Sequence, residues 1–380
     1  MGSMEQRDPI RRFTPSSTRH PAGRTMRFGI SATALLVATS LVVTVGGAAH
    51  PSAQKRSSPT AIANNPIAPR LQWDANYGYC GETSFIAAGL FFGEYLSQYD
   101  ARVLASNNAN QARESSQLLI GVNDVRAARK MHLAAEPWQP STLASSSSFL
   151  TWIKAHVIEG QPVIIGVYAN SYLIDGNTSP TAGSNEYDHI VTVTGVSSHR
   201  PLTLPTSARR NDTLTFDDHG LWDGDGATPQ FSFTYSFGSF QMDRRQANAS
   251  NGTVYGLSNQ TANYGIAITG VADPAHETLP VHLTTATNAE RPVMRDGSTA
   301  RPRSRALTMT ATVSGLTPGE NYTLYRYDAM DKTPEIAFNA HAGNAAQLWT
   351  FTATTTTFSV TQSFASSDQV IYRAVPTSGA

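Results

Sequence analysis

Cys80 is the only cysteine in this 380-residue chain, and its surroundings favour chemistry over packing. A short loop over residues 73–79 leads to it, and the apolar spacing that follows predicts a helix over residues 80–99. Backbone N–H groups and the positive end of the helix dipole stabilise a thiolate over a thiol at such a position. We therefore expect Cys80 to act as a nucleophile.

A thiolate nucleophile needs a base and a group that orients that base, and the sequence offers both. His189 stands at the start of an apolar strand over residues 190–195, a rigid element that can hold its imidazole. Asp217 and Asp218 stand at the end of another strand, farther along the chain. Strand alternation favours Asp217 as the residue that turns toward His189, with Asp218 as the alternative.

Four motifs in this order resemble the papain superfamily of cysteine peptidases, and most closely its double-glycine-peptidase-like branch of bacteriocin-processing peptidases and their exported relatives. They are Cys-Gly at 80–81, Gly-Gln-Pro-Val-Ile-Ile-Gly-Val-Tyr at 160–168, Asp-His-Ile-Val-Thr-Val-Thr-Gly at 188–195 and Asp-Asp-His-Gly at 217–220. The resemblance implies a papain-like fold in which Cys80 is the nucleophile, His189 the base and Asp217 the orienting acid. It also implies a cysteine peptidase that hydrolyses peptide or isopeptide bonds without a cofactor.

The donor that stabilises the oxyanion departs from the family pattern. Papain-like enzymes usually carry a glutamine six residues before the cysteine, and here that position is Asp74, which cannot donate when ionised. Gln72 and Asn76, on either side of Asp74, are the candidates for the missing donor. Glu82 adds a negative charge close to the sulfur, although it also suits a helix N-terminus.

Residues 71–273 predict an α+β domain, because the expected helices precede most of the expected strands. Besides the helix that begins at Cys80, helices are expected over 124–133 and 148–159, and strands over 163–168, 190–195, 212–216 and 264–269.

Residues 306–380 predict a small β-sandwich, because Thr, Val, Tyr and Phe alternate there without a helical period. The turn over residues 315–322 resembles part of a fibronectin type III domain, in which Tyr322 would form a tyrosine corner. Residues 54–70 and 274–305 are irregular and contain proline, so we expect both to be linkers.

Residues 1–53 predict an export signal. Arg24 and Arg27 precede an uncharged apolar run over 28–45, and small residues of the kind that signal peptidases accept follow at 46–49. We expect a secreted, extracellular protein that makes no membrane contact after signal removal, or one anchored outside the cytoplasm if the apolar run is retained.

Composition narrows the possible partners. Lys plus Arg and Asp plus Glu both number 28, so net charge gives no reason to expect a nucleic-acid partner. The resemblance to cysteine peptidases implies a peptide or protein substrate as the partner. No metal is expected either, because the acidic turn at 223–226 lacks the spacing of a calcium loop and the histidines are scattered. Two other functions stay open: an inactive papain-like protein that binds at the cell surface, and acyl transfer as in transglutaminase-like folds.

Overall fold

The computed structural model describes residues 60–73, 75–138, 145–169, 187, 189–219, 232–240, 255–257, 263–285 and 299–377. The expected export signal, Asp74 and the acidic turn at 223–226 lie outside these residues. All described residues belong to one compact unit, Ser58–Ala380. Within them, no helix is long and apolar enough to cross a membrane.

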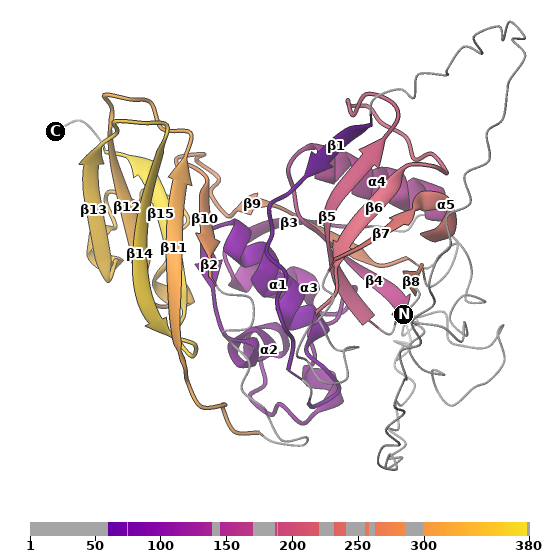
Figure 1. Cartoon of the computed structure of the whole chain (residues 1–380). Coiled ribbons are helices and arrows are strands. Elements are labelled where there is room, and N and C mark those ends of the chain that lie inside the picture. The colour runs from indigo at the N-terminus through magenta and orange to yellow at the C-terminus, as the bar shows by residue number, and fades with distance from the viewer. Residues whose placement is uncertain are drawn as a thin grey trace, which may run out of the picture. The chain divides into compact units, whose positions relative to one another are not determined.

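The chain has an α+β fold, as the sequence predicts, and its strands pair antiparallel. The first sheet has the order β3-β9-β4-β5-β6-β7, with β1 beside β5 and β8 beside β4 (Figure 1). Its strands are β1 (Ala61–Asn64), β3 (Leu133–Pro137), β4 (Val163–Ala169), β5 (His189–Ser198), β6 (Thr213–Asp217), β7 (Ser232–Ser236), β8 (Tyr255–Gly256) and β9 (Gly265–Val271). The accompanying helices are α1 (Cys80–Phe91), α2 (Gln98–Ser106), α3 (Asp124–Lys130), α4 (Ser146–Ile158) and α5 (Phe237–Phe240).

Strands β4 and β5 lie at the centre of this sheet and divide the apolar side chains between two cores. Ile164 and Ile190 pack into the core that contains α1, whereas Val163 and Val191 pack into the core that contains α4. Successive side chains of a strand point to opposite faces, so a continuous apolar run such as that of β4 serves both cores. His189 and Cys80 stand at the first residues of β5 and α1.

The C-terminal segment forms two further sheets. One has the order β10-β11-β14, with β10 (Val281–Thr284), β11 (Ala306–Ser314) and β14 (Thr357–Ala365). The other has the order β13-β12-β15-β2, with β13 (Gln347–Thr352), β12 (Asn321–Tyr327), β15 (Val370–Pro376) and β2 (Glu94–Tyr95). The Tyr322 hydroxyl accepts a hydrogen bond from the Thr317 N–H at 2.9 Å, a contact of the kind that a tyrosine corner makes.

The expected linkers both contain strands. β1 lies within 54–70 and pairs with β5, and β10 lies within 274–305 and pairs with β11. The C-terminal sheets therefore begin before residue 306, and they also recruit β2, a strand that directly follows α1. β2 has two residues and its partner β15 lies far along the chain, so the local sequence around β2 could not predict this pairing.

Two helices end earlier than their apolar patterns predict. The helix expected over 80–99 ends at Phe91, because Gly93 has a positive φ of 76° and reverses the chain into β2. A Cβ on Gly93 would lie 3.0 Å from the carbonyl oxygen of Tyr372, so this close approach also favours glycine. The helix expected over 124–133 ends at Lys130, and Leu133 already belongs to β3.

Candidate active site

Cys80 and His189 are brought together by the contact between α1 and β5. Cys80 is the first residue of α1 and is partly exposed, whereas the side chain of His189 is buried. The imidazole of His189 is hydrogen-bonded to the thiol of Cys80. Tyr79 makes no capping side-chain hydrogen bond at the start of α1. Cys80 is the first residue of this helix, a position at which the helix dipole favours a thiolate. The arrangement has an accessible sulfur and a buried base in direct contact.

Asp218 completes a chain of contacts that begins at the sulfur. Its Oδ2 lies 3.1 Å from Nε2 of His189, and the Tyr255 hydroxyl donates to the same oxygen. Burial alone would lower the pKa of His189, but Asp218 and Cys80 together raise this pKa above its ordinary value. Burial likewise opposes ionisation of the aspartate, but His189 and Tyr255 lower the pKa of Asp218 below its ordinary value. The site therefore favours an imidazolium held between a carboxylate and the sulfur.

Asp217, which strand alternation favoured as the orienting residue, does not contact His189. It is the last residue of β6 and lies opposite Thr192 of β5, and its side chain is hydrogen-bonded to Ser232. Thr192 is three residues from His189, so the two side chains point to opposite faces of β5, and Asp217 shares the face of Thr192. Asp218, one residue beyond the strand, is the acid that reaches the imidazole.

A second histidine, His219, packs beside the first. The two imidazole centroids lie 6.2 Å apart, and Nε2 of His219 lies 2.7 Å from the hydroxyl of Ser84 on α1. Burial, reinforced by the charge of His189, lowers the pKa of His219 to about 3. His219 is therefore neutral at ordinary pH and adds no competing charge beside the imidazolium.

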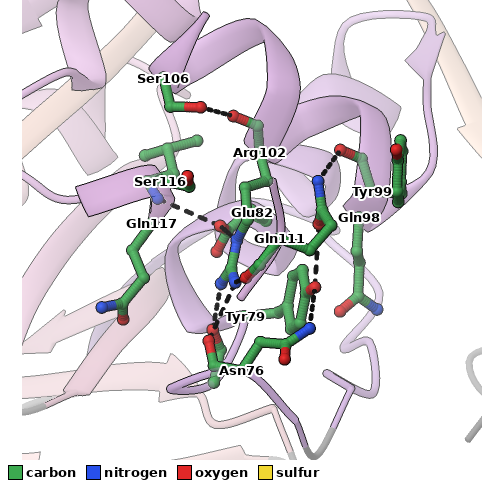
Figure 2. Close-up of polar contacts among 12 residues, drawn as sticks. Asn76, Tyr79, Glu82, Gln98, Tyr99, Arg102, Ser106, Gln111, Ser116 and Gln117 are labelled. Carbon is green, nitrogen blue, oxygen red and sulfur yellow. Dashed lines mark hydrogen bonds and ion pairs between the residues drawn. The ribbon is translucent and has the colours of Figure 1, made fainter. Parts of the chain in front are cut away.

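The turn that leads to Cys80 has an unusual backbone. Asn76, Tyr77 and Gly78 all have positive φ, at 50°, 68° and 83°, in a region that residues other than glycine seldom adopt. Arg102 of α2 stabilises this turn by donating to the carbonyl oxygens of Asn76, at 2.9 Å, and of Gly78. Figure 2 shows the guanidinium of Arg102 directed toward Asn76 and Tyr79. Its guanidinium also lies 3.6 Å from the centroid of the Tyr79 ring.

Glu82, whose negative charge the sequence places near the sulfur, forms an ion pair with Arg102. The carboxylate lies 2.6 Å from Nε of Arg102, and both side chains are fully buried. Glu82 also accepts the backbone N–H of Leu118 at 3.1 Å. Its negative charge is thus neutralised within the protein, so it opposes a thiolate at Cys80 much less than an unpaired carboxylate would.

The packing of Leu118 against α1 explains why a glycine, Gly81, follows Cys80. A Cβ at this position would lie 2.0 Å from the carbonyl oxygen of Leu118, which no real contact permits. Only glycine lets the 117–123 loop cross the first turn of α1 so closely. The Cys-Gly pair therefore has a packing reason in addition to its proximity to the thiol.

The two oxyanion candidates have different surroundings. The side-chain amide of Gln72 is buried and makes no hydrogen bond with any described residue. A Cβ on Gly78 would lie 3.3 Å from Nε2 of Gln72, and the Gln72 backbone N–H donates to the carbonyl of His219 at 3.1 Å. The amide of Asn76 instead donates to the Tyr79 hydroxyl at 3.2 Å. Gln72 is therefore the candidate whose buried amide has no hydrogen-bond partner among the described residues.

Sequence reasoning missed Tyr255, Arg102 and the Ser84–His219 contact. Of these, only Arg102 had a signal in the sequence: Glu82 lies within an apolar helix, and a buried carboxylate requires a cation as its partner. Among the described residues, no group of three or more His, Cys, Asp or Glu side chains is arranged to hold a metal ion.

In comparisons of the sequence with known proteins, no protein-family model matches the chain and no curated protein matches it. The resemblance to papain-like peptidases therefore rests on the four sequence motifs.

Proposed function

We propose that the chain is an exported papain-like cysteine peptidase that hydrolyses peptide or isopeptide bonds at Cys80. The observation that carries this proposal is the continuous contact from the Cys80 thiol through His189 to Asp218 at the N-terminus of α1. A buried imidazole bonded on one side to a carboxylate and on the other to a thiol is the arrangement that nucleophilic catalysis by cysteine requires.

The reaction proceeds in two balanced steps. The Cys80 thiolate attacks the substrate carbonyl carbon and a C–S bond forms. As the C–N bond breaks, the His189 imidazolium gives its proton to the departing amine. Water then attacks the thioester while neutral His189 takes its proton, the C–S bond breaks, and the carboxylic acid leaves with the thiolate and imidazolium restored.

Gln72 is the residue that we assign to the oxyanion. Its amide makes no other hydrogen bond among the described residues and lies beside Gly78, two residues before the nucleophile. An unpaired buried donor costs free energy in the resting protein, and this cost is recovered when the donor meets developing negative charge. The Asn76 amide, which already donates to Tyr79, is not assigned this role.

Digestion of a peptide library by the purified exported chain tests the proposal, with cleavage read by mass spectrometry and Cys80→Ala as the control. We expect cleavage that disappears in Cys80→Ala, together with alkylation of Cys80 by iodoacetamide at pH 7 much faster than that of free cysteine. A folded protein whose Cys80 reacts no faster than free cysteine, and which cleaves no peptide, would be a binding protein and not a peptidase.

A further inference from the structure

Tyr255 is fixed in place independently of the site that it contacts. It belongs to β8, which pairs with β4 through Ala169↔Tyr255, and its side chain is fully buried. Its ring centroid lies 5.0 Å from those of Phe216 and Phe233, at interplanar angles of 77° and 57°. A ring held on two sides by aromatic neighbours aims its hydroxyl in one direction.

The hydroxyl of Tyr255 is aimed at the oxygen that orients the base. Oδ2 of Asp218 accepts from both Tyr255 and Nε2 of His189, so one carboxylate oxygen is held from two directions. The Tyr255 hydroxyl opposes rotation of this carboxylate about its Cβ–Cγ bond, a rotation that would move the oxygen away from the imidazole. A neutral donor can prevent this rotation without adding a charge that would compete with the imidazolium.

We propose that Tyr255 is a positioning residue of the thiol site, which holds the Asp218 carboxylate in the orientation that keeps the His189 imidazolium against Cys80. This inference rests on the proposed function and extends it to a fourth residue from a separate strand. The contact also has a purely structural interpretation, in which Asp218 only satisfies a buried hydroxyl. The two interpretations differ in what happens at the sulfur, because only the positioning role connects the Tyr255 hydroxyl to thiolate formation.

The rate of Cys80 alkylation by iodoacetamide across the pH range measures thiolate formation without a substrate. In Tyr255→Phe we expect the midpoint of the rate profile to move upward by roughly half to one pH unit, because the loosened imidazolium stabilises the thiolate less. Tyr327→Phe is the matched control: Tyr327 is a buried tyrosine of β12 whose hydroxyl makes no hydrogen bond with a described residue. Its midpoint should equal that of the wild type.

A double-mutant cycle shows whether Tyr255 acts through Asp218. In an Asp218→Asn background, Tyr255→Phe should shift the midpoint no further, because the carboxylate that the hydroxyl positions is gone. An equal shift in both backgrounds would assign Tyr255 a general structural effect and overturn the proposal. An unchanged midpoint in Tyr255→Phe, with a fast wild-type thiol, would overturn the positioning role alone. A wild-type thiol no faster than free cysteine would overturn the proposed function together with this extension.

A second measurement covers the case in which Tyr255→Phe does not fold. Placing 3-fluorotyrosine at position 255 by stop-codon suppression keeps the ring and hydroxyl and gives a single assigned fluorine resonance. We expect this resonance to titrate with the midpoint of Cys80 alkylation and to lose that titration in Cys80→Ser. A fluorine chemical shift that does not change as Cys80 ionises would contradict the proposal.

Discussion

Glu82 and Arg102 form an ion pair of 2.6 Å beside the turn that leads to Cys80. Arg102 donates three further hydrogen bonds to backbone carbonyls, and two of these carbonyls, of Asn76 and Gly78, belong to a run of residues with positive φ. The pair therefore has two separable roles. It neutralises a buried charge, and it fixes the backbone that precedes the nucleophile.

Arg102→Met should destabilise the protein by about 3 to 5 kcal/mol, because it leaves the Glu82 carboxylate buried without its cation. Adding Glu82→Gln should recover part of that free energy but not the rate of Cys80 alkylation, because the turn still lacks its donor. Denaturant unfolding and alkylation kinetics measure the two effects separately. Arg126→Met, at an exposed position of α3, is the control. A double variant with the wild-type alkylation rate would show that the turn keeps its shape without Arg102.

Gln72→Ala should lower kcat/KM for peptide cleavage by about 100- to 1000-fold, the usual cost of losing one oxyanion donor. The free energy of unfolding should change little, because the Gln72 amide makes no hydrogen bond with a described residue. Asn76→Ala is the comparison, and it should lower stability more than turnover, because its amide donates to Tyr79. The reverse pattern would move the oxyanion role to Asn76.

Asp217 should make the stability of the protein depend on pH. Burial raises its pKa from 3.8 to about 7 in the folded protein, so the folded chain retains a proton that the unfolded chain releases. The contribution of Asp217 is therefore fully present below about pH 4 and is lost as pH rises through 7, a fall on the order of 1 to 4 kcal/mol. Asp217→Asn should remove this fall in the free energy of unfolding between pH 4.5 and 7.5.

Asp328→Asn, at an exposed position of the C-terminal segment, should keep the wild-type pH dependence. The Asp217→Asn variant should also retain most of its thiol reactivity, whereas Asp218→Ala should lose most of it, because only Asp218 contacts His189. Equal losses of reactivity in the two variants would contradict this assignment.

Arg373→Met should destabilise the whole chain by about 3 to 5 kcal/mol. Arg373 of β15 pairs with buried Glu94 and donates to the carbonyl of Phe92, just beyond the helix that begins at Cys80. Arg303→Met is the control, because Arg303 is exposed and an exposed charge should contribute no more than about 1 kcal/mol. A single unfolding transition shared by both variants would show that the C-terminal sheets and α1 unfold together. Separate transitions would show that they are independent.

Local sequence determined where the two central functional side chains stand. The helix that begins at Cys80 and the strand that begins at His189 follow from apolar patterns a few residues long, because each element's periodicity depends on its own side chains. The β4 strand after Pro162 and the helix α3 after Asn123 were likewise predictable, within a few residues at their ends. The α+β class follows from the order of these elements.

Tertiary structure decided the contacts that no local pattern contains. The choice of Asp218 over Asp217 depends on the register of β6 against β5, which places Asp217 opposite Thr192 and hence on the face away from His189. Tyr255 meets Asp218 only because β8 pairs with β4. A register or a strand pairing is a property of two segments at once, and the sequence of either segment alone does not specify its partner.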